Sequence, residues 1–152
     1  MRVAVLLVVA LPLAAADLWV KTFATTPDWA YHERSAGWIF LCLMLLPTLL
    51  LVTRIPSTLV PPAAGLLAAG VLGNVMSAAW NDLYVPNPIV IHGERGFVAF
   101  NLADVFAVVG IFLLFGAIAA WLVRNRSLLP PPQEAFARVR RGEWRSDRRP
   151  PA

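Results

Sequence analysis

The stretch Phe100-Asn101-Leu102-Ala103-Asp104 stands directly before an apolar run that extends from Val105 to Val123. A carboxylate at the start of a membrane-spanning helix costs free energy, because it is charged and lies close to the lipid. Such residues usually face a protein interior or a water-filled cavity, and they mark function. A purely structural role is the alternative. Asn101 would then cap the helix, and Asp104 would complement the helix dipole from the first turn.

The composition separates this chain from ordinary soluble domains. Of its 152 residues, 59% are hydrophobic and 14% are charged, and the mean hydropathy is +0.66. These values are too apolar for a soluble globular domain. The single cysteine, Cys42, lies inside an apolar run, so neither a disulfide within the chain nor a cysteine-based zinc site is possible. We expect no metal and no cofactor.

Four apolar segments predict an all-α membrane protein with four transmembrane helices. A bilayer core of ~30 Å needs about 20 helical residues, and helices are the open-chain structures that satisfy the backbone in lipid. The predicted spans are residues 3–20, 37–53, 59–79 and 102–123. The second is short, but Gly37 and Thr53 can extend it. We expect one domain over residues 1–126 and a Pro/Arg-rich tail over residues 127–152.

The first segment has a second interpretation. Met1-Arg2, the following apolar run and Ala14-Ala15-Ala16 also fit a secretory signal peptide with a small-residue cleavage site. The apolar length lies near the border between a signal peptide and a span. Cleavage would leave Asp17 and Lys21 in an N-terminal tail.

The positions of the basic residues predict the topology. With four spans both termini lie on one side, which carries ten of the 13 Lys and Arg residues: Arg2, Arg54 and the eight arginines from Arg124 to Arg149. The positive-inside rule places that side in the cytoplasm and two polar loops, residues 21–37 and 80–99, outside. We expect the basic tail to be disordered and to contact anionic lipid headgroups rather than nucleic acid.

The remaining polar residues of interest are two histidines in the loops and one asparagine in the third apolar segment. His32 and His92 lie in separate loops, and no His-Glu-x-x-His spacing supports a metal, so we interpret both as surface histidines. Asn74 lies among apolar residues near the end of the third segment. Its amide must find a partner, and bonding between helices is the structural interpretation.

Three motifs resemble those of signal peptidase II, the lipoprotein signal peptidase, which is an intramembrane aspartic peptidase. The resemblance covers the four-span layout, roughly residues 17–124. It implies a multi-pass protein of the bacterial inner membrane that cuts lipid-modified prolipoproteins before the lipidated cysteine, without a cofactor. The motifs are Asp17-x-x-x-Lys21, Gly73-Asn74 and Phe100-Asn101-Leu102-Ala103-Asp104.

The sequence also departs from the family pattern. Ser77 and Ala78 stand where the family has Asp-Arg, and the family's Asn-x-Gly motif is not clear after the first loop. The most serious departure concerns the Val-Val-Asp-Phe motif, which carries a catalytic aspartate. Its best match is Val85-Pro86-Asn87-Pro88, so Asn87 stands in place of that aspartate, 17 residues before Asp104.

This substitution matters because the family chemistry needs two carboxylates. Two close carboxylates share a proton, and one activates water while the other protonates the developing tetrahedral centre. An asparagine amide can orient a water molecule but cannot take its proton. Loss of such a base typically costs a factor of ~10²–10⁴. Asp104 alone would therefore be a weak catalyst unless Asp82 or Glu94 supplied the second acid.

Three hypotheses follow. The first is a signal peptidase II-like aspartic endopeptidase with reduced or lost activity. The second is a non-catalytic binder of lipoprotein signal helices or lipid on the same scaffold, and the third is a small structural membrane subunit whose motif match is coincidental. Failure of Asn74 and Asp104 to converge would favour the third. The candidate site consists of Asp104 and Asn87 with support from Asn74, Asn101, Asp17 and Lys21.

Overall fold

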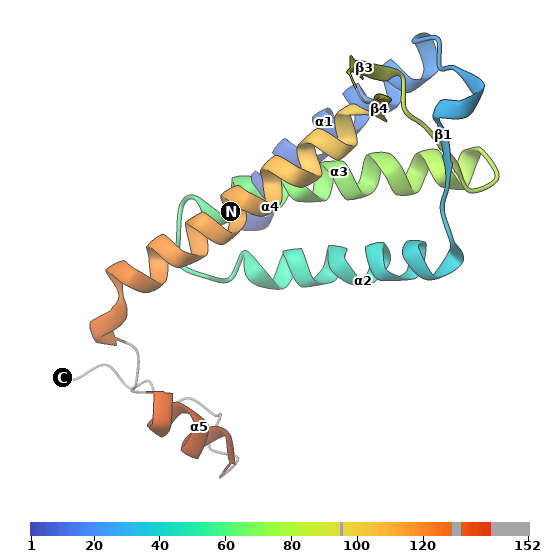
Figure 1. Ribbon diagram of the computed structural model, residues 1–152. Helices are drawn as coiled ribbons and strands as arrows, with labels where there is room; N and C mark the ends of the chain where they lie inside the picture. The colour runs from blue at the N-terminus through green and yellow to red at the C-terminus, as the bar shows by residue number, and fades with distance from the viewer. Residues whose placement is uncertain (95, 129–131, 141–152) are drawn as a thin grey trace. The chain divides into compact units, whose positions relative to one another are not determined.

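The computed structural model describes residues 1–94, 96–128 and 132–140 (Figure 1). The chain divides into two compact units, residues 1–119 and 120–152. The first contains α1 (Arg2–Phe23), α2 (Ala36–Val52), α3 (Val60–Trp80) and most of α4 (Leu102–Arg124). These helices begin and end within three residues of the four spans predicted from hydropathy.

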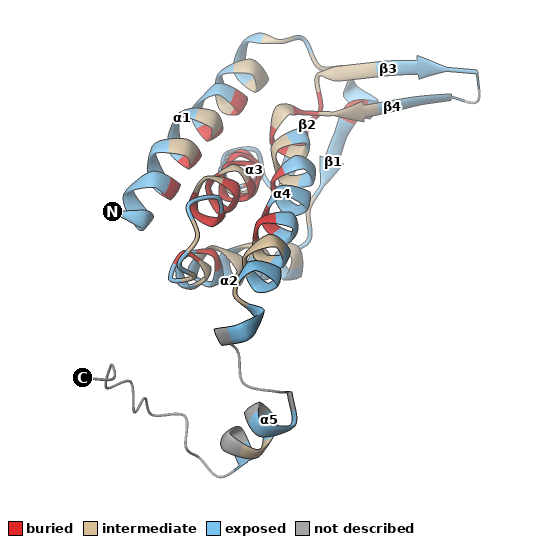
Figure 2. Ribbon diagram, turned by 90° about the vertical axis from the view of Figure 1, so that its left-hand side faces the viewer, coloured by how far each residue is buried: buried red, intermediate tan, exposed pale blue. Residues whose placement is uncertain are grey.

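Helix α3 is the central helix of the first unit. Small residues on α3 allow its neighbours to approach closely, because a Cβ at Gly70 would collide with the main chain of Ala103 in α4. Most of α3 is buried, whereas α1 and α4 expose most of their apolar side chains (Figure 2). Outward-facing apolar side chains suit helices that are surrounded by lipid.

Three helices of the described chain, α1, α3 and α4, are long and apolar enough to cross a membrane. Helix α2 has 17 residues, or about 25 Å at ~1.5 Å per residue, which is shorter than a bilayer core. It lies alongside α3 (Figure 1). A fourth crossing by α2, and with it the complete four-span topology, stays a prediction.

The polar loops contain short strands, which the all-α prediction did not include. Strand β1 (Tyr31–Glu33) pairs antiparallel with β2 (Tyr84–Pro86), and β3 (Ile89–Gly93) pairs with β4 (Gly96–Phe100). Figure 2 shows the β3–β4 hairpin extending away from the helices. The hairpin is rich in β-branched and aromatic residues on either side of a glycine-containing turn, a composition that favours strands. A 3-10 helix, η1 (Asp28–Ala30), precedes β1.

The second unit contains the end of α4, the short η2 (Arg126–Leu128) and α5 (Pro132–Arg140). The structure differs here from the prediction of a disordered tail, because residues 132–140 are helical. Glu134 in the first turn of α5 complements the helix dipole. Residues 129–131 and 141–152, with four of the arginines on which the tail prediction rested, lie outside the described residues.

Candidate functional site at the start of helix α4

Helix α4 begins with a reciprocal cap. The Asp104 main-chain N–H donates to Asn101 Oδ1 at 2.9 Å, and the Asn101 main-chain N–H donates to Asp104 Oδ2 at 3.2 Å. This is the capping-box arrangement, with aspartate in the position usually held by glutamate. The structural role considered for Asp104 is therefore present. It occupies one carboxylate oxygen and leaves Oδ1 for another partner.

That other partner comes from α3. Asn74 Nδ2 donates to Asp104 Oδ1 at 2.9 Å, and Asn74 Oδ1 accepts a hydrogen bond from Lys21 Nζ at 2.7 Å. Lys21 lies about one helical turn after Asp17 on α1, and its Nζ lies 2.7 Å from Asp17 Oδ2. The Lys21 and Asp17 side chains are 4% and 0% exposed, so this ion pair is held in the protein interior.

Asp17 also joins α1 to α4. Its Oδ1 accepts a hydrogen bond from the Ala103 main-chain N–H at 2.8 Å, one of the first-turn N–H groups that find no partner within their own helix. A Cβ at Gly73 would lie 2.5 Å from Asp17 Oδ2, so the absence of a side chain at Gly73 makes room for the carboxylate. A buried, charged network thus connects three helices beside Asp104.

A second set of contacts extends from Asn101 into the loops. Asn101 Nδ2 donates to Asn87 Oδ1 at 2.6 Å, and Asn87 Nδ2 lies 3.1 Å from His32 Nδ1 and 3.4 Å from the Ala99 carbonyl oxygen. The Asn87 main-chain N–H donates to the Ala30 carbonyl oxygen at 3.1 Å. Asn87 is 1% exposed. Both ends of its amide are therefore engaged.

The β1–β2 pair explains how residues from two loops meet here. Its register places His32 opposite Val85 and Tyr31 opposite Pro86, which ends β2. Proline is tolerated at such a strand end, because its missing N–H breaks no interior ladder. Asn87 follows immediately and is held beside β1.

The structure joins all six candidate residues of the sequence analysis into one chain of contacts. Within the described residues, Asn87 and Asp104 are bridged by Asn101 rather than bonded directly. Asp82 and Glu94 are exposed, and in the part of the chain that is described neither bonds to Asp104 or Asn87. The six residues, in contact order, are Asp17, Lys21, Asn74, Asp104, Asn101 and Asn87.

His32 belongs to this network although the sequence analysis interpreted it as a surface histidine. Its side chain is exposed overall, but Nδ1 faces the buried Asn87 amide. No local pattern could have shown this, because 55 residues separate the two and strand pairing brings them together. Among the described residues, no group of three or more His, Cys, Asp or Glu side chains could hold a metal ion.

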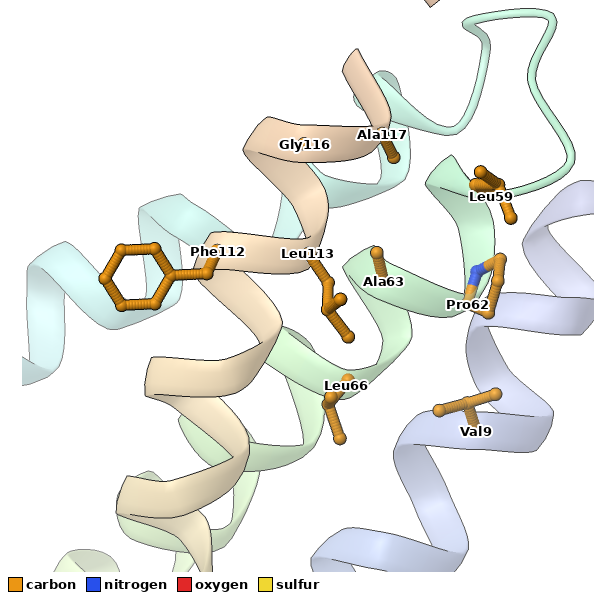
Figure 3. Close-up of a pocket in the computed structure, with 9 residues that line it drawn as sticks. All are labelled: Val9, Leu59, Pro62, Ala63, Leu66, Phe112, Leu113, Gly116 and Ala117. Carbon is orange, nitrogen blue, oxygen red and sulfur yellow. The ribbon is translucent and has the colours of Figure 1, made fainter. Parts of the chain in front are cut away.

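An apolar cavity of about 490 Å³ lies between α1, α3 and α4, apart from the polar network. Figure 3 shows Leu66 of α3 and Leu113 of α4 pointing into it, whereas the Phe112 ring points away. The lining of α4 begins about two turns beyond Asp104. The cavity residues are Val9, Leu59, Pro62, Ala63, Leu66, Phe112, Leu113, Gly116 and Ala117.

Comparison with known proteins places this arrangement in a family. A solved structure described as a bacterial membrane enzyme, determined by the in meso method, has a TM-score of 0.56 and 17% sequence identity over 82% of this chain and 91% of that chain. At this identity the likeness shows a shared fold. No curated protein is significantly similar to the chain in sequence.

The family model described as signal peptidase (SPase) II matches residues 19–120. This range is more than half of the chain, and it contains Lys21, Asn74, Asn87, Asn101 and Asp104. The match contradicts the hypothesis that the Phe-Asn-x-Ala-Asp motif is coincidental. With apolar helices long enough to cross a membrane and the family's motifs in mutual contact, the chain belongs to the signal peptidase II family, the aspartic peptidases of membrane lipoproteins.

Proposed function

We propose that this membrane protein binds lipid-modified prolipoproteins through their signal helices, and that it cleaves them weakly or not at all. The observation that carries this proposal is the hydrogen-bonded amide of Asn87. The family resemblance expects a catalytic carboxylate at this position, and the structure has an amide whose Oδ1 and Nδ2 are both hydrogen-bonded. An amide in this position cannot accept a proton from water.

Asp104 keeps the features of the remaining acid. Its two carboxylate oxygens accept from Asn74 Nδ2 and from the Asn101 main-chain N–H, which matches the acceptor-only character of a carboxylate. The residue is half-buried, so part of it is accessible from outside the protein. Asp104 can therefore polarise a water or a scissile carbonyl, but it lacks the partner that would complete proton transfer.

Asp82 and Glu94, the two candidates for the second acid, are not among the residues of the polar network. Asp82 lies in the turn after α3 with a positive φ of 49°, and Glu94 lies at the end of the hairpin. Both are exposed, and neither contacts the network in the described part of the protein. Asp17 is a carboxylate of the network, but Lys21 and the Ala103 N–H occupy it. This arrangement supports weak or absent cleavage.

The apolar cavity supports the binding half of the proposal. A signal helix whose cleavage end lay at Asp104 would run along α1, α3 and α4, where the cavity of about 490 Å³ offers apolar walls. Concave apolar sites with a few polar groups at one end are typical of ligand sites. The polar network lies about two helical turns away along α4, so in this proposal an extended signal helix contacts both regions and binding survives the loss of the base.

The orientation of the site is part of the same proposal. We place both termini in the cytoplasm, α2 across the membrane, the site at the outer face of the bacterial inner membrane, and the arginine-rich tail near anionic headgroups. With this topology, a reporter fused after Arg54 should lie in the cytoplasm, and a reporter fused after Arg95 should lie outside. The contacts of Asp17 and Lys21 inside the helix bundle favour retention of α1 over cleavage after Ala16. An N-terminus near Asp17 in the isolated protein would contradict this.

The test of catalysis compares the native chain with Asn87→Asp and Asp104→Asn. We expect at most slow cleavage of a diacylglyceryl-modified prolipoprotein by the native chain. Restoration of the second carboxylate by Asn87→Asp should raise cleavage by a factor of about 10²–10⁴, with a bell-shaped pH profile. Asn81→Asp is the matched control, because it adds a carboxylate near the end of α3 without changing position 87.

Two results would contradict the proposal. Rapid cleavage by the native chain that Asp104→Asn abolishes would show that another acid serves the site. Native, Asn87→Asp and Asp104→Asn forms that all fail to bind the lipid-modified signal peptide would exclude the binding role. Binding by the native chain, with cleavage gained in Asn87→Asp, is the expected outcome.

A further inference from the structure

The direction of the hydrogen bonds around Asn101 is fixed by main-chain groups. The Asp104 main-chain N–H can only donate, so the Asn101 side chain turns Oδ1 toward it and Nδ2 away. Nδ2 then lies 3.4 Å from the Pro86 carbonyl oxygen, which can only accept. These two anchors leave a single orientation for the Asn101 amide, with its donor end toward Asn87.

The same reasoning fixes Asn87 and then His32. Asn87 Oδ1 accepts from Asn101 Nδ2, so Asn87 Nδ2 faces the opposite way, toward the Ala99 carbonyl oxygen and His32 Nδ1. A donor that faces Nδ1 requires Nδ1 to be the acceptor. The ring is therefore neutral, with its proton on Nε2. A protonated imidazole would set an N–H against the Asn87 N–H.

We infer that His32 is a positioning residue of this site, which accepts the Asn87 amide and so holds Asn87 Oδ1 against Asn101 at the start of α4. The inference rests on the proposed function, because the ligand is the signal helix proposed above. Without the His32 acceptor, the buried Asn87 Nδ2 keeps only the longer bond to Ala99. Reversal of the amide would then place two NH₂ groups against each other, and the loop would separate from Asn101.

Asn87 is the hydrogen-bond partner that the described residues give the His32 ring. The ring is exposed to solvent, and the apolar Val85 lies opposite it on β2. Within the described residues, none of the charged or titratable groups on the surrounding elements forms an ion pair or hydrogen bond with His32. These groups are Asp28 of η1, Tyr31 and Glu33 of β1, Arg34 after β1, Tyr84 of β2, and His92 and Glu94 of the β3–β4 hairpin.

Removal of the His32 acceptor should therefore weaken binding of the signal helix. The probe is a synthetic prolipoprotein signal peptide with a diacylglyceryl-modified cysteine, and the protein is the full chain in lipid nanodiscs. We expect roughly tenfold weaker binding by a variant that lacks this acceptor, the usual cost of a lost hydrogen bond to a buried group.

Three variants separate the acceptor atom from the rest of the His32 side chain. His32→Gln keeps an acceptor oxygen, so it should bind about as tightly as the native chain. His32→Leu has no acceptor and should bind about tenfold more weakly than the native chain. His92→Gln, the control, should behave like the native chain. An unchanged affinity in His32→Leu would overturn the inference.

A second measurement does not depend on the peptide. The chain has two histidines, so ¹⁵N-histidine labelling in the His92→Gln background reports the His32 ring alone. We expect an unprotonated Nδ1 and a protonated Nε2 at about pH 8, and a shift of the proton to Nδ1 in Asn87→Asp, where the neighbour becomes an acceptor. A protonated Nδ1 in the chain with Asn87 present would overturn the inference. If no form binds the peptide, the proposed function fails, and the tautomer still decides whether His32 holds Asn87.

Discussion

The two halves of the polar network around Asp104 are built from different chemistry. The helical half is charged, since the buried Asp17–Lys21 pair joins α1 to Asn74 of α3 and to the start of α4. The loop half is neutral, since Asn101, Asn87 and His32 meet through amide and imidazole groups. Charge persists where it holds helices together. It is absent at Asn87, where the family resemblance expects a catalytic carboxylate.

This difference predicts unequal costs of mutation. A buried ion that loses its partner is far more expensive than an amide that loses one of several hydrogen bonds. Variants in the helical half should therefore unfold the protein more easily. Variants in the loop half should change ligand binding with smaller effects on stability.

The largest expected effect is that of Asp17→Ala. This change leaves the Lys21 ammonium buried without its counter-charge and removes the acceptor of the Ala103 N–H. The free energy of unfolding in detergent should fall by about 3–5 kcal/mol. The double variant Asp17→Leu/Lys21→Met removes both charges and should lose less. A double variant at least as unstable as Asp17→Ala would show that the ion pair does not dominate this half.

The second-largest expected effect is that of Gly73→Ala, which fills the space beside the Asp17 carboxylate. Gly73→Ala would place a methyl group 2.5 Å from Asp17 Oδ2 and should destabilise the protein by about 1–3 kcal/mol through displacement of the ion pair. Gly116→Ala is the matched control, because a Cβ at Gly116 meets no atom within 4 Å. The control should be neutral or stabilising by up to about 1 kcal/mol, since alanine favours helix. Equal melting temperatures for the two variants would contradict close packing at Gly73.

The helical half was largely predictable from the sequence. Hydropathy fixed the four helices, because lipid demands long apolar segments. The motif around Asp104 and the polar residues Asn74, Asp17 and Lys21 pointed to one end of the bundle, where the structure joins them. Each of these residues lies near the end of a predicted span, and the resemblance to the signal peptidase II motifs grouped them into one site.

The loop half was not predictable in the same way. The pairing of β1 with β2 joins segments more than 50 residues apart, and the short strands carry weak local signals. His32 was therefore interpreted as a surface residue, and its contact with Asn87 depends on a register that no local pattern encodes. The arginines after residue 140 lie outside the described residues, so the lipid contact of the tail stays a prediction.

The smallest expected effect tests the residue that both halves share. Asn101 Oδ1 caps α4 through the Asp104 N–H, and Asn101 Nδ2 reaches Asn87. Asn101→Ala removes both contacts and should lower the free energy of unfolding by about 1 kcal/mol, the usual cost of a lost helix cap. Asn101→Ser keeps a good capping oxygen but has no NH₂ group for Asn87, so its stability should stay within a few tenths of a kcal/mol of the native value. Its affinity for the lipid-modified signal peptide should nevertheless fall, because the loop then loses its link to the start of α4. Equal affinity and stability of Asn101→Ser and the native chain would mean that the neutral half does not contribute to binding, and that the charged half alone maintains the site.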